Sequence, residues 1–343
     1  MSLFKEINTE NKLRLTLTYL AMNTLREDQE YFDIGIAALV NRIITHYSPD
    51  ANASISMKLA IYRNNLASTL SGTHADVIEL LVKAEEKRLI ASIPAYRDTP
   101  GSFLLRISNA NIFLLTEDTT SHEELYYPKG IKGYVQALVE EFCRLPFIER
   151  EKIYCKENYN QLLQSMNKEH AVYIIHSFGK KYLTRIYAIT SDPLSTYSYV
   201  VCRLINPQNK KMDGRIYSFR LSRIVQVIEK PSISGAFTDA EKKSTANAIA
   251  KNGVQFINDR INTIVVEFTD EGLKLFNSSM HLRPHVTKIY EDKHTYEFQC
   301  TSGQAVFYFR RLGASAKVIK PAFVAEELAK WYQDAAVKYS ENL

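Results

Sequence analysis

Apolar and polar residues alternate without a break from Lys12 to Thr18, with leucines at positions 13, 15 and 17. Successive side chains of a β-strand point to opposite faces, so this pattern predicts a half-buried strand with one leucine face. The residues of its polar face are Lys12, Arg14, Thr16 and Thr18. We expect this face to be exposed to solvent or to a binding partner.

Two short helical patterns follow, and the second runs from Ile36 to Tyr47 after a break at Gly35. A strand and two helices are too small to close a core alone, so we expect two copies to pair their strands as an antiparallel ribbon. The segment Leu39–Ile44 resembles the second helix of the ribbon-helix-helix family, whose ribbons bind duplex DNA. The resemblance implies that the polar face of the strand, Lys12, Arg14, Thr16 and Thr18, contacts the major groove. The alternative is an amphipathic segment that packs on a larger domain.

The next hundred or so residues are mostly helical in pattern. Helices are predicted over Asn52–Leu70, Ala75–Leu89 and Gly133–Leu145, and the second has an apolar stripe that we expect to be buried. The members of that stripe are Val77, Leu80, Leu81 and Ala84. The apolar segment Ser102–Leu115 fits either a strand or a helix. We interpret this region as a helical connector.

Two arginines, Arg220 and Arg223, interrupt a strand-like apolar run between Gly214 and Val227. A guanidinium does not lose its charge, so each needs an anionic or carbonyl partner if it is buried. The alternative is that both lie on the solvent face of the strand.

Positive charge is concentrated around these arginines. Residues 171–230 contain ten basic and three acidic residues, a net charge of +7, whereas the whole chain carries +5. Several tyrosines lie within the same stretch, among the 21 of the chain. Cations interleaved with aromatic rings suit single-stranded nucleic acid, because phosphates pair with cations and bases stack on rings.

Four segments occur here in the order typical of a WYL domain, and we identify a resemblance to that family. They are Ala171–Phe178, Arg185, Tyr197–Arg203 and Phe219–Ile224. The family triplet corresponds to Ser198-Tyr199-Val200, and Ser222 stands where the family usually has aspartate. The resemblance implies an Sm-like β-barrel that serves as a sensor. It also implies a ligand site formed by His176, Arg185, Tyr199, Arg220 and Arg223.

The C-terminal part is predicted to be a small βαβ-like domain. Strands are expected over Asn262–Thr269, His294–Cys300 and Ala305–Arg311, followed by a helix over Phe323–Tyr339. The segment Gln304–Pro321 resembles the extension that follows WYL domains, which commonly packs across a dimer. A charged helix over Phe237–Asn252 is expected to act as a hinge.

The cysteines and the N-terminal residues bear on compartment and cofactors. The four cysteines are widely spaced without a C-x-x-C pair, which argues against structural zinc and disulfides. Met1–Glu10 has no apolar signal core, and no apolar run approaches the roughly 20 residues of a membrane span. We therefore expect a cytoplasmic protein without metal, cofactor or membrane association.

The sequence lacks the common catalytic motifs. The sequence has no phosphate-binding loop, no dinucleotide-binding glycine motif, no H-E-x-x-H and no nucleophile with a recognisable base. We do not expect an enzyme.

Together these patterns predict an α+β protein of four parts. They are a ribbon-helix-helix module (1–48), a helical connector (49–150), a WYL domain (151–232) and a C-terminal α/β dimerisation domain (233–343). This order resembles the ribbon-helix-helix–WYL accessory proteins of type VI-D CRISPR systems. That resemblance implies a homodimer that binds single-stranded RNA and modulates an RNA-targeting effector in antiviral defence. The alternative is a repressor whose ribbon binds operator DNA and whose WYL domain senses a nucleotide-like effector.

Overall fold

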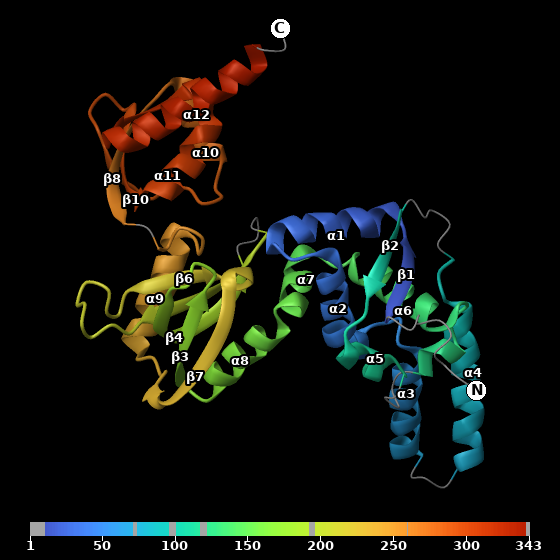
Figure 1. The fold of residues 1–343 in the computed structure, drawn as a ribbon. Helices are drawn as coiled ribbons and strands as arrows, with labels where there is room; N and C mark the ends of the chain where they lie inside the picture. Colours follow the sequence, from blue (N-terminus) through green and yellow to red (C-terminus); the bar gives the residue numbers. More distant parts are fainter. Residues whose placement is uncertain are drawn as a thin grey trace. The chain divides into compact units, whose positions relative to one another are not determined.

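The computed structural model of the protein describes residues 11–70, 74–95, 101–116, 122–191, 196–258 and 260–340. These residues form a mixed α+β fold in which every strand pair is antiparallel. The chain divides into two compact units, Met1–Lys156 and Glu157–Leu343 (Figure 1). The predicted α+β class is confirmed.

The first unit is mainly helical around a two-stranded sheet. Its elements are β1 (Lys12–Leu17), α1 (Tyr19–Phe32), α2 (Ile36–Tyr47), α3 (Ile55–Thr69), α4 (Ala75–Ala91), β2 (Gly101–Arg106), α5 (Asn109–Thr116), α6 (Gly130–Phe142) and α7 (Phe147–Tyr154). One hydrophobic core runs from Leu13 to Tyr154. Residues on both sides of the predicted boundary at 48/49 therefore share a core.

The predicted strand is confirmed as β1, but its predicted partner is wrong. β1 pairs with β2 of the same chain, in a register that sets Lys12 opposite Arg106 and Leu17 opposite Gly101. The leucine face is fully buried within one chain, with Leu15 at 0% exposure. A second copy is not needed to cover it, because α2 and α6 supply the apolar surface. The structure thus matches the alternative of an amphipathic segment packed on a larger domain.

The segment Ser102–Leu115, which fitted either a strand or a helix, contains both: strand β2 is followed by helix α5. The α2 side chain of Asn41 fixes the turn between them: its Nδ2 donates to the Arg106 carbonyl at 2.9 Å, and its Oδ1 accepts from the Ser108 amide at 2.8 Å. β2 is therefore anchored to α2 as well as to β1.

The apolar stripe predicted to be buried on α4 is exposed. Leu80 is 69% exposed and Val77 47% exposed, whereas Ile78, Val82 and Leu89 face the core. Helix α4 has apolar residues on two faces. Helix α3 packs on the face that carries Ile78, Val82 and Leu89, and not on the predicted stripe. The periodicity was correct for a helix but did not distinguish between the two faces.

The second unit contains two sheets with their helices. Its elements are α8 (Lys156–Asn167), β3 (His170–His176), β4 (Lys181–Ser191), β5 (Ser198–Leu204), β6 (Ile216–Arg220), the short helical turn η4 (Leu221–Arg223), β7 (Ile224–Ser234), α9 (Asp239–Asn252), β8 (Ile261–Phe268), α10 (Asp270–Ser278), β9 (Val286–Ile289), β10 (Thr295–Thr301), α11 (Ser302–Phe309), β11 (Ala316–Lys320) and α12 (Ala322–Ser340).

The five strands of the WYL-like region form an open sheet in the order β6-β5-β4-β3-β7. The predicted closed barrel is wrong for the described residues, because β6 and β7 do not pair with each other and remain edges. Helix α9 packs on one face of this sheet (Figure 1). Its N-terminus carries a reciprocal capping box between Thr238 and Glu241. The predicted hinge helix is thus present, but as a packed element.

The C-terminal sheet has the order β11-β8-β10-β9 with antiparallel neighbours, so the predicted βαβ arrangement is wrong. The strand predicted over Ala305–Arg311 is instead helix α11. Thr301 caps that helix, since its hydroxyl accepts the Gln304 amide at 3.2 Å. Gln304, Ala305, Tyr308 and Phe309 are buried, a helical spacing that the short apolar run concealed. None of the helices in the described part of the chain is long and apolar enough to span a membrane.

Candidate nucleic-acid interface

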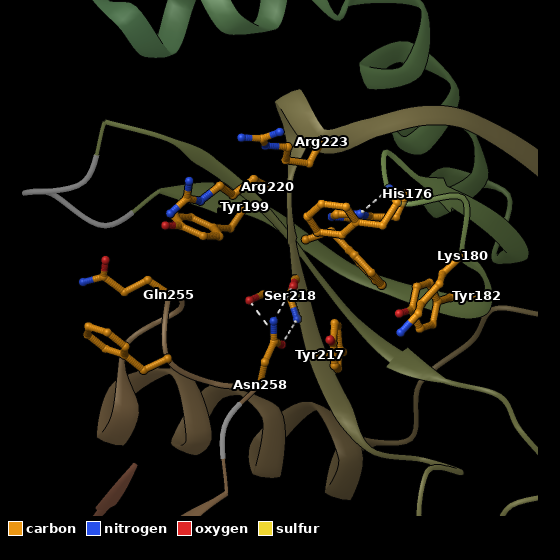
Figure 2. Close-up of a pocket in the computed structure, with 13 residues that line it drawn as sticks. His176, Lys180, Tyr182, Tyr199, Tyr217, Ser218, Arg220, Arg223, Gln255 and Asn258 are labelled. Carbon is orange, nitrogen blue, oxygen red and sulfur yellow. Dashed lines mark hydrogen bonds between the residues drawn. The ribbon is translucent and has the colours of Figure 1, made fainter. Parts of the chain in front are cut away.

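A pocket of about 520 Å³ lies in the second unit (Figure 2). Side chains come from the β3–β4 hairpin, from β5, from the β6–η4 corner and from the segment after α9. The lining residues are His176, Phe178, Lys180, Tyr182, Tyr199, Tyr217, Ser218, Phe219, Arg220, Arg223, Gln255, Phe256 and Asn258. Four of the five residues predicted for the WYL site are among them. The pocket therefore lies where the resemblance placed a ligand site.

The cations of the pocket are exposed. Lys180, Arg220 and Arg223 line it, and none of its described lining residues is acidic. No ion pair between described residues involves any of the three. Of the two alternatives for the arginines, the solvent face is the one observed. Their charge is available to an anionic ligand.

Arg220 is nevertheless held in place. Its guanidinium lies 4.1 Å from the centroid of the Tyr197 ring, a cation–π contact that orients the side chain without neutralising it. In Figure 2, Arg220 and Arg223 lie at one end of the pocket, and Asn258 lies away from them. A ligand that spans the pocket would contact guanidinium groups at one end and the Asn258 amide at the other.

Aromatic rings form much of the pocket wall. Tyr182 and Tyr217 stack with ring centroids 5.9 Å apart and an interplanar angle of 24°. Phe219 lies between them and His176, 4.9 Å from Tyr217 and 6.0 Å from His176. These contacts give the pocket a pre-formed apolar wall beside its cations.

The Asn258 side chain forms hydrogen bonds with the backbone of Ser218 at the edge strand β6. Its Oδ1 accepts the Ser218 amide at 2.6 Å and its Nδ2 donates to the Ser218 carbonyl at 2.7 Å (Figure 2). These two bonds imitate a neighbouring strand at one residue of the edge. The segment after α9 is thereby fixed against the sheet and completes the pocket.

The pKa of His176 is lowered, first by partial burial and then by the nearby positive charge of Arg223. At neutral pH the ring is therefore mainly uncharged. His176 contributes an aromatic face and a ring nitrogen to the pocket rather than a charge.

Arg185 was predicted to line the site, but the structure places it elsewhere. Its guanidinium forms an ion pair with Glu241 and donates to the Ala236 carbonyl at 2.8 Å. It also lies 4.9 Å from the centroid of the Phe237 ring. Arg185 therefore connects β4 to the start of α9 and is absent from the pocket lining.

Tyr199 lines the pocket but is only 4% exposed. Its ring packs with Val201 and Val254 between the sheet and the segment after α9. Tyr199 is therefore at the pocket, but a base has little of this ring to stack on.

The sequence pattern indicated Tyr182 and Tyr217 of the aromatic wall, but not Phe178 or the segment 255–258. Phe178, Gly179 and Lys180 had a signal, since a glycine after a predicted strand and before a cation marks a turn near the basic region. Gln255 and Asn258 had none, because only the packing of α9 brings them beside β6.

The first unit presents a second basic surface, on the outer face of the β1–β2 ribbon. The register places Lys12 opposite Arg106, Arg14 opposite Leu104 and Thr16 opposite Ser102. Arg14 and Arg106 are exposed, and neither strand contains an acidic residue. This face combines three predicted strand residues, Lys12, Arg14 and Thr16, with Arg106, a cation from β2 that the sequence did not indicate.

Thr18 does not share the outer face of the ribbon. Its hydroxyl donates to Glu140 at 2.6 Å and caps α1 by accepting the Ala21 amide at 3.3 Å. The predicted nucleic-acid contact of Thr18 is replaced by a structural one.

Metal binding has no evident location in the described part of the chain. Across those residues, no three His, Cys, Asp or Glu side chains are grouped to hold an ion.

Comparisons with known proteins show a likeness of fold. No protein-family model matches the sequence, and neither does any curated protein sequence. A solved structure described as a CRISPR Cas-related protein matches over 97% of this chain and 95% of its own, with a TM-score of 0.71 and 16% identity. The two chains share a fold.

A second solved structure is more distant. The proteasome accessory factor B/C (PafBC) of Arthrobacter aurescens aligns over 89% of this chain and 54% of its own, with a TM-score of 0.32 and 10% identity. That TM-score is too low to indicate a common fold.

Proposed function

We propose that this chain is a regulatory or accessory protein whose second unit binds single-stranded nucleic acid, with RNA preferred. The observation that carries the proposal is the pocket in which Lys180, Arg220 and Arg223 are exposed beside an aromatic wall and no described lining residue is acidic. Such a surface attracts phosphates and offers rings to bases. Neither arginine forms an ion pair with a described residue, so the charge of both is left for a ligand.

The preference for RNA rests on the resemblance to accessory proteins of type VI-D CRISPR systems. The solved structure of similar fold is a CRISPR Cas-related protein, which supports the same setting. We propose a role beside a CRISPR effector in antiviral defence, with no catalytic step of its own.

The direct test is filter binding of the full chain with labelled single-stranded RNA, single-stranded DNA and duplex DNA at several salt concentrations. We expect single-stranded RNA to bind most tightly. Three phosphate contacts should give a slope of about −2 for log affinity against log salt, since each contact to a single strand contributes about −0.7. Absence of single-strand binding, or binding independent of salt, would contradict the proposal.

A second function, binding of duplex DNA by the first unit, is favoured by the outer face of the β1–β2 ribbon. The major groove of B-DNA, about 12 Å wide, admits a two-stranded antiparallel ribbon. Arg14 and Arg106 are placed for phosphates or guanines, and the small polar residues Thr16 and Ser102 lie opposite each other beyond Arg14. In this account the protein is a repressor, and the pocket senses a nucleotide-like effector.

A further inference from the structure

The tip of the β3–β4 hairpin carries a phenylalanine that the protein's own core does not use. Phe178 is 78% exposed although it lines the pocket. The other phenylalanine of the neighbouring strands, Phe219, is 3% exposed, and Tyr199 is 4% exposed. Of the aromatic residues that line the pocket, Phe178 is the one with most of its ring open to a ligand.

The position of Phe178 is set by a tight turn. The His176 amide donates to the Lys180 carbonyl at 2.9 Å, and the Gly179 amide donates to the His176 carbonyl at 2.8 Å. Gly179 has φ +73°, a backbone conformation that residues other than glycine rarely adopt. The turn therefore holds Phe178 and Lys180 on either side of Gly179.

His176 lies against the ring of Phe178. The two ring centroids are 4.9 Å apart with an interplanar angle of 34°, and the Phe178 amide lies 3.3 Å from His176 Nδ1. His176 in turn contacts Phe219, whose centroid is 6.0 Å away. The exposed ring is thus supported from below by a series of packed rings.

The hairpin is also linked to the cations of the pocket. The Ser177 amide donates to the Arg223 carbonyl at 2.9 Å, so the residue before Phe178 is bonded to the backbone of a pocket arginine. Lys180 follows in the same turn. The backbone bonds therefore place an aromatic ring and two cations near one another, as binding of a base together with its flanking phosphates requires.

We propose that Phe178, supported by His176, is the platform on which one base of the bound single strand stacks, and that Arg223 and Lys180 contact the phosphates on either side. The inference rests on the proposed function, because it names the residue that contacts a base within that site. In this proposal Phe178 takes the base-stacking role that the sequence had assigned to Tyr199, because the protein itself covers the Tyr199 ring.

The test compares Phe178→Ala, Phe178→Leu and Phe178→Trp in the full chain, with binding of a single-stranded RNA measured across a salt series. Stacking of one base contributes about 1–3 kcal/mol, so Phe178→Ala should weaken binding by about 5-fold to 150-fold. The salt slope should not change, because no charge is removed. Phe178→Trp should retain affinity, whereas Phe178→Leu, which is apolar but cannot stack, should lose it.

Two controls separate stacking from other effects. Phe323→Ala removes a 51% exposed phenylalanine on α12, outside the pocket, and should leave binding unchanged. An RNA scanned with abasic sites should show one position at which loss of the base weakens binding to the wild type but not to Phe178→Ala. Melting curves confirm that each variant is folded.

The outcomes distinguish this inference from the proposed function. If the wild type binds no single strand, both fail. If the wild type binds and Phe178→Ala binds equally well, the stacking inference alone is overturned. If Phe178→Leu keeps full affinity, the ring acts only as an apolar contact, and stacking is again overturned.

Discussion

Arg185 of β4 and Glu241 in the first turn of α9 form an ion pair in which both side chains are mostly shielded from solvent, at 19% and 25% exposure. The Glu241 carboxylate also accepts the Thr238 amide at 3.0 Å, so one carboxylate both caps the helix and joins it to the sheet. The pair therefore positions α9, and through α9 the residues that complete the pocket.

Arg185→Ala should lower stability rather than directly remove a ligand contact. Hydrogen bonds to charged groups contribute about 1.5–3 kcal/mol, and we expect a loss of that order in the free energy of unfolding. Thermal and denaturant unfolding measure it. Glu241→Gln should cost a similar amount, and the double variant less than the sum. A fully folded Arg185→Ala protein whose RNA binding shows a salt slope smaller by about 0.7 would instead return Arg185 to the binding site.

The same pair predicts a dependence on acid. The hydrogen bonds from Arg185 hold the pKa of Glu241 at about 2, below its ordinary value of 4.5. Because the folded-state pKa is the lower one, the ionised carboxylate stabilises the fold above about pH 4.5, and this contribution is lost as the pH falls towards 2. The melting temperature of Glu241→Gln should consequently fall less over this range than that of the wild type. Parallel curves for the two proteins would refute the linkage.

Arg220→Ala and Arg223→Ala should each weaken binding of single-stranded RNA and reduce the magnitude of the salt slope by about 0.7. The reason is that each guanidinium is exposed in the pocket and lacks an acidic partner among the described residues. Stability should change little, because neither side chain is buried. Lys274→Ala, an exposed cation on α10 outside the pocket, is the matched control. Slopes that stay at the wild-type value would show that the arginines do not contact phosphate.

Arg14→Ala and Arg106→Ala test the ribbon. If the outer face enters the major groove, each should weaken duplex DNA binding, by about 1–3 kcal/mol where the arginine contacts a base pair. Binding of single-stranded RNA should be unaffected, because the ribbon belongs to the first unit. Arg26→Ala, an exposed cation on α1, serves as the control in gel-shift titrations. Unchanged duplex affinity in both ribbon variants would remove the repressor account.

Leu15→Ala should destabilise the first unit by about 2–5 kcal/mol, because Leu15 is fully buried in the core of a single chain. Since β2 rather than a second copy is the partner of β1, this loss should not depend on protein concentration. Thermal unfolding over about a hundredfold concentration range, with light scattering to follow the homodimer predicted from the sequence, provides the measurement. A loss that grows on dilution would show that the leucine face is buried by association.

Local pattern alone was sufficient for several elements. The alternation from Lys12 to Thr18 predicted β1, because a period of two is a property of the strand itself. The spacing of Val324, Leu328 and Trp331 likewise predicted α12, although Trp331 is 45% exposed and the other two are buried. The run Ala305–Arg311 was predicted as a strand but belongs to helix α11. A short apolar stretch fits both the strand and the helix period, and the N-cap at Thr301 favours the helix.

For the site, the sequence by itself determined the chemistry: a local excess of positive charge, two arginines within a strand-like run and tyrosines among them. Only the tertiary structure decided which of these residues face a ligand. Arg185 pairs with Glu241, 56 residues away, and Tyr199 is covered by packing with Val254, while Phe178 is left exposed at a hairpin tip. β1 pairs with β2, which begins more than eighty residues later in the chain. The reason is physical: strand periodicity and charge are local properties of the chain, whereas burial and partner choice depend on contacts between residues far apart in sequence, which local pattern does not specify.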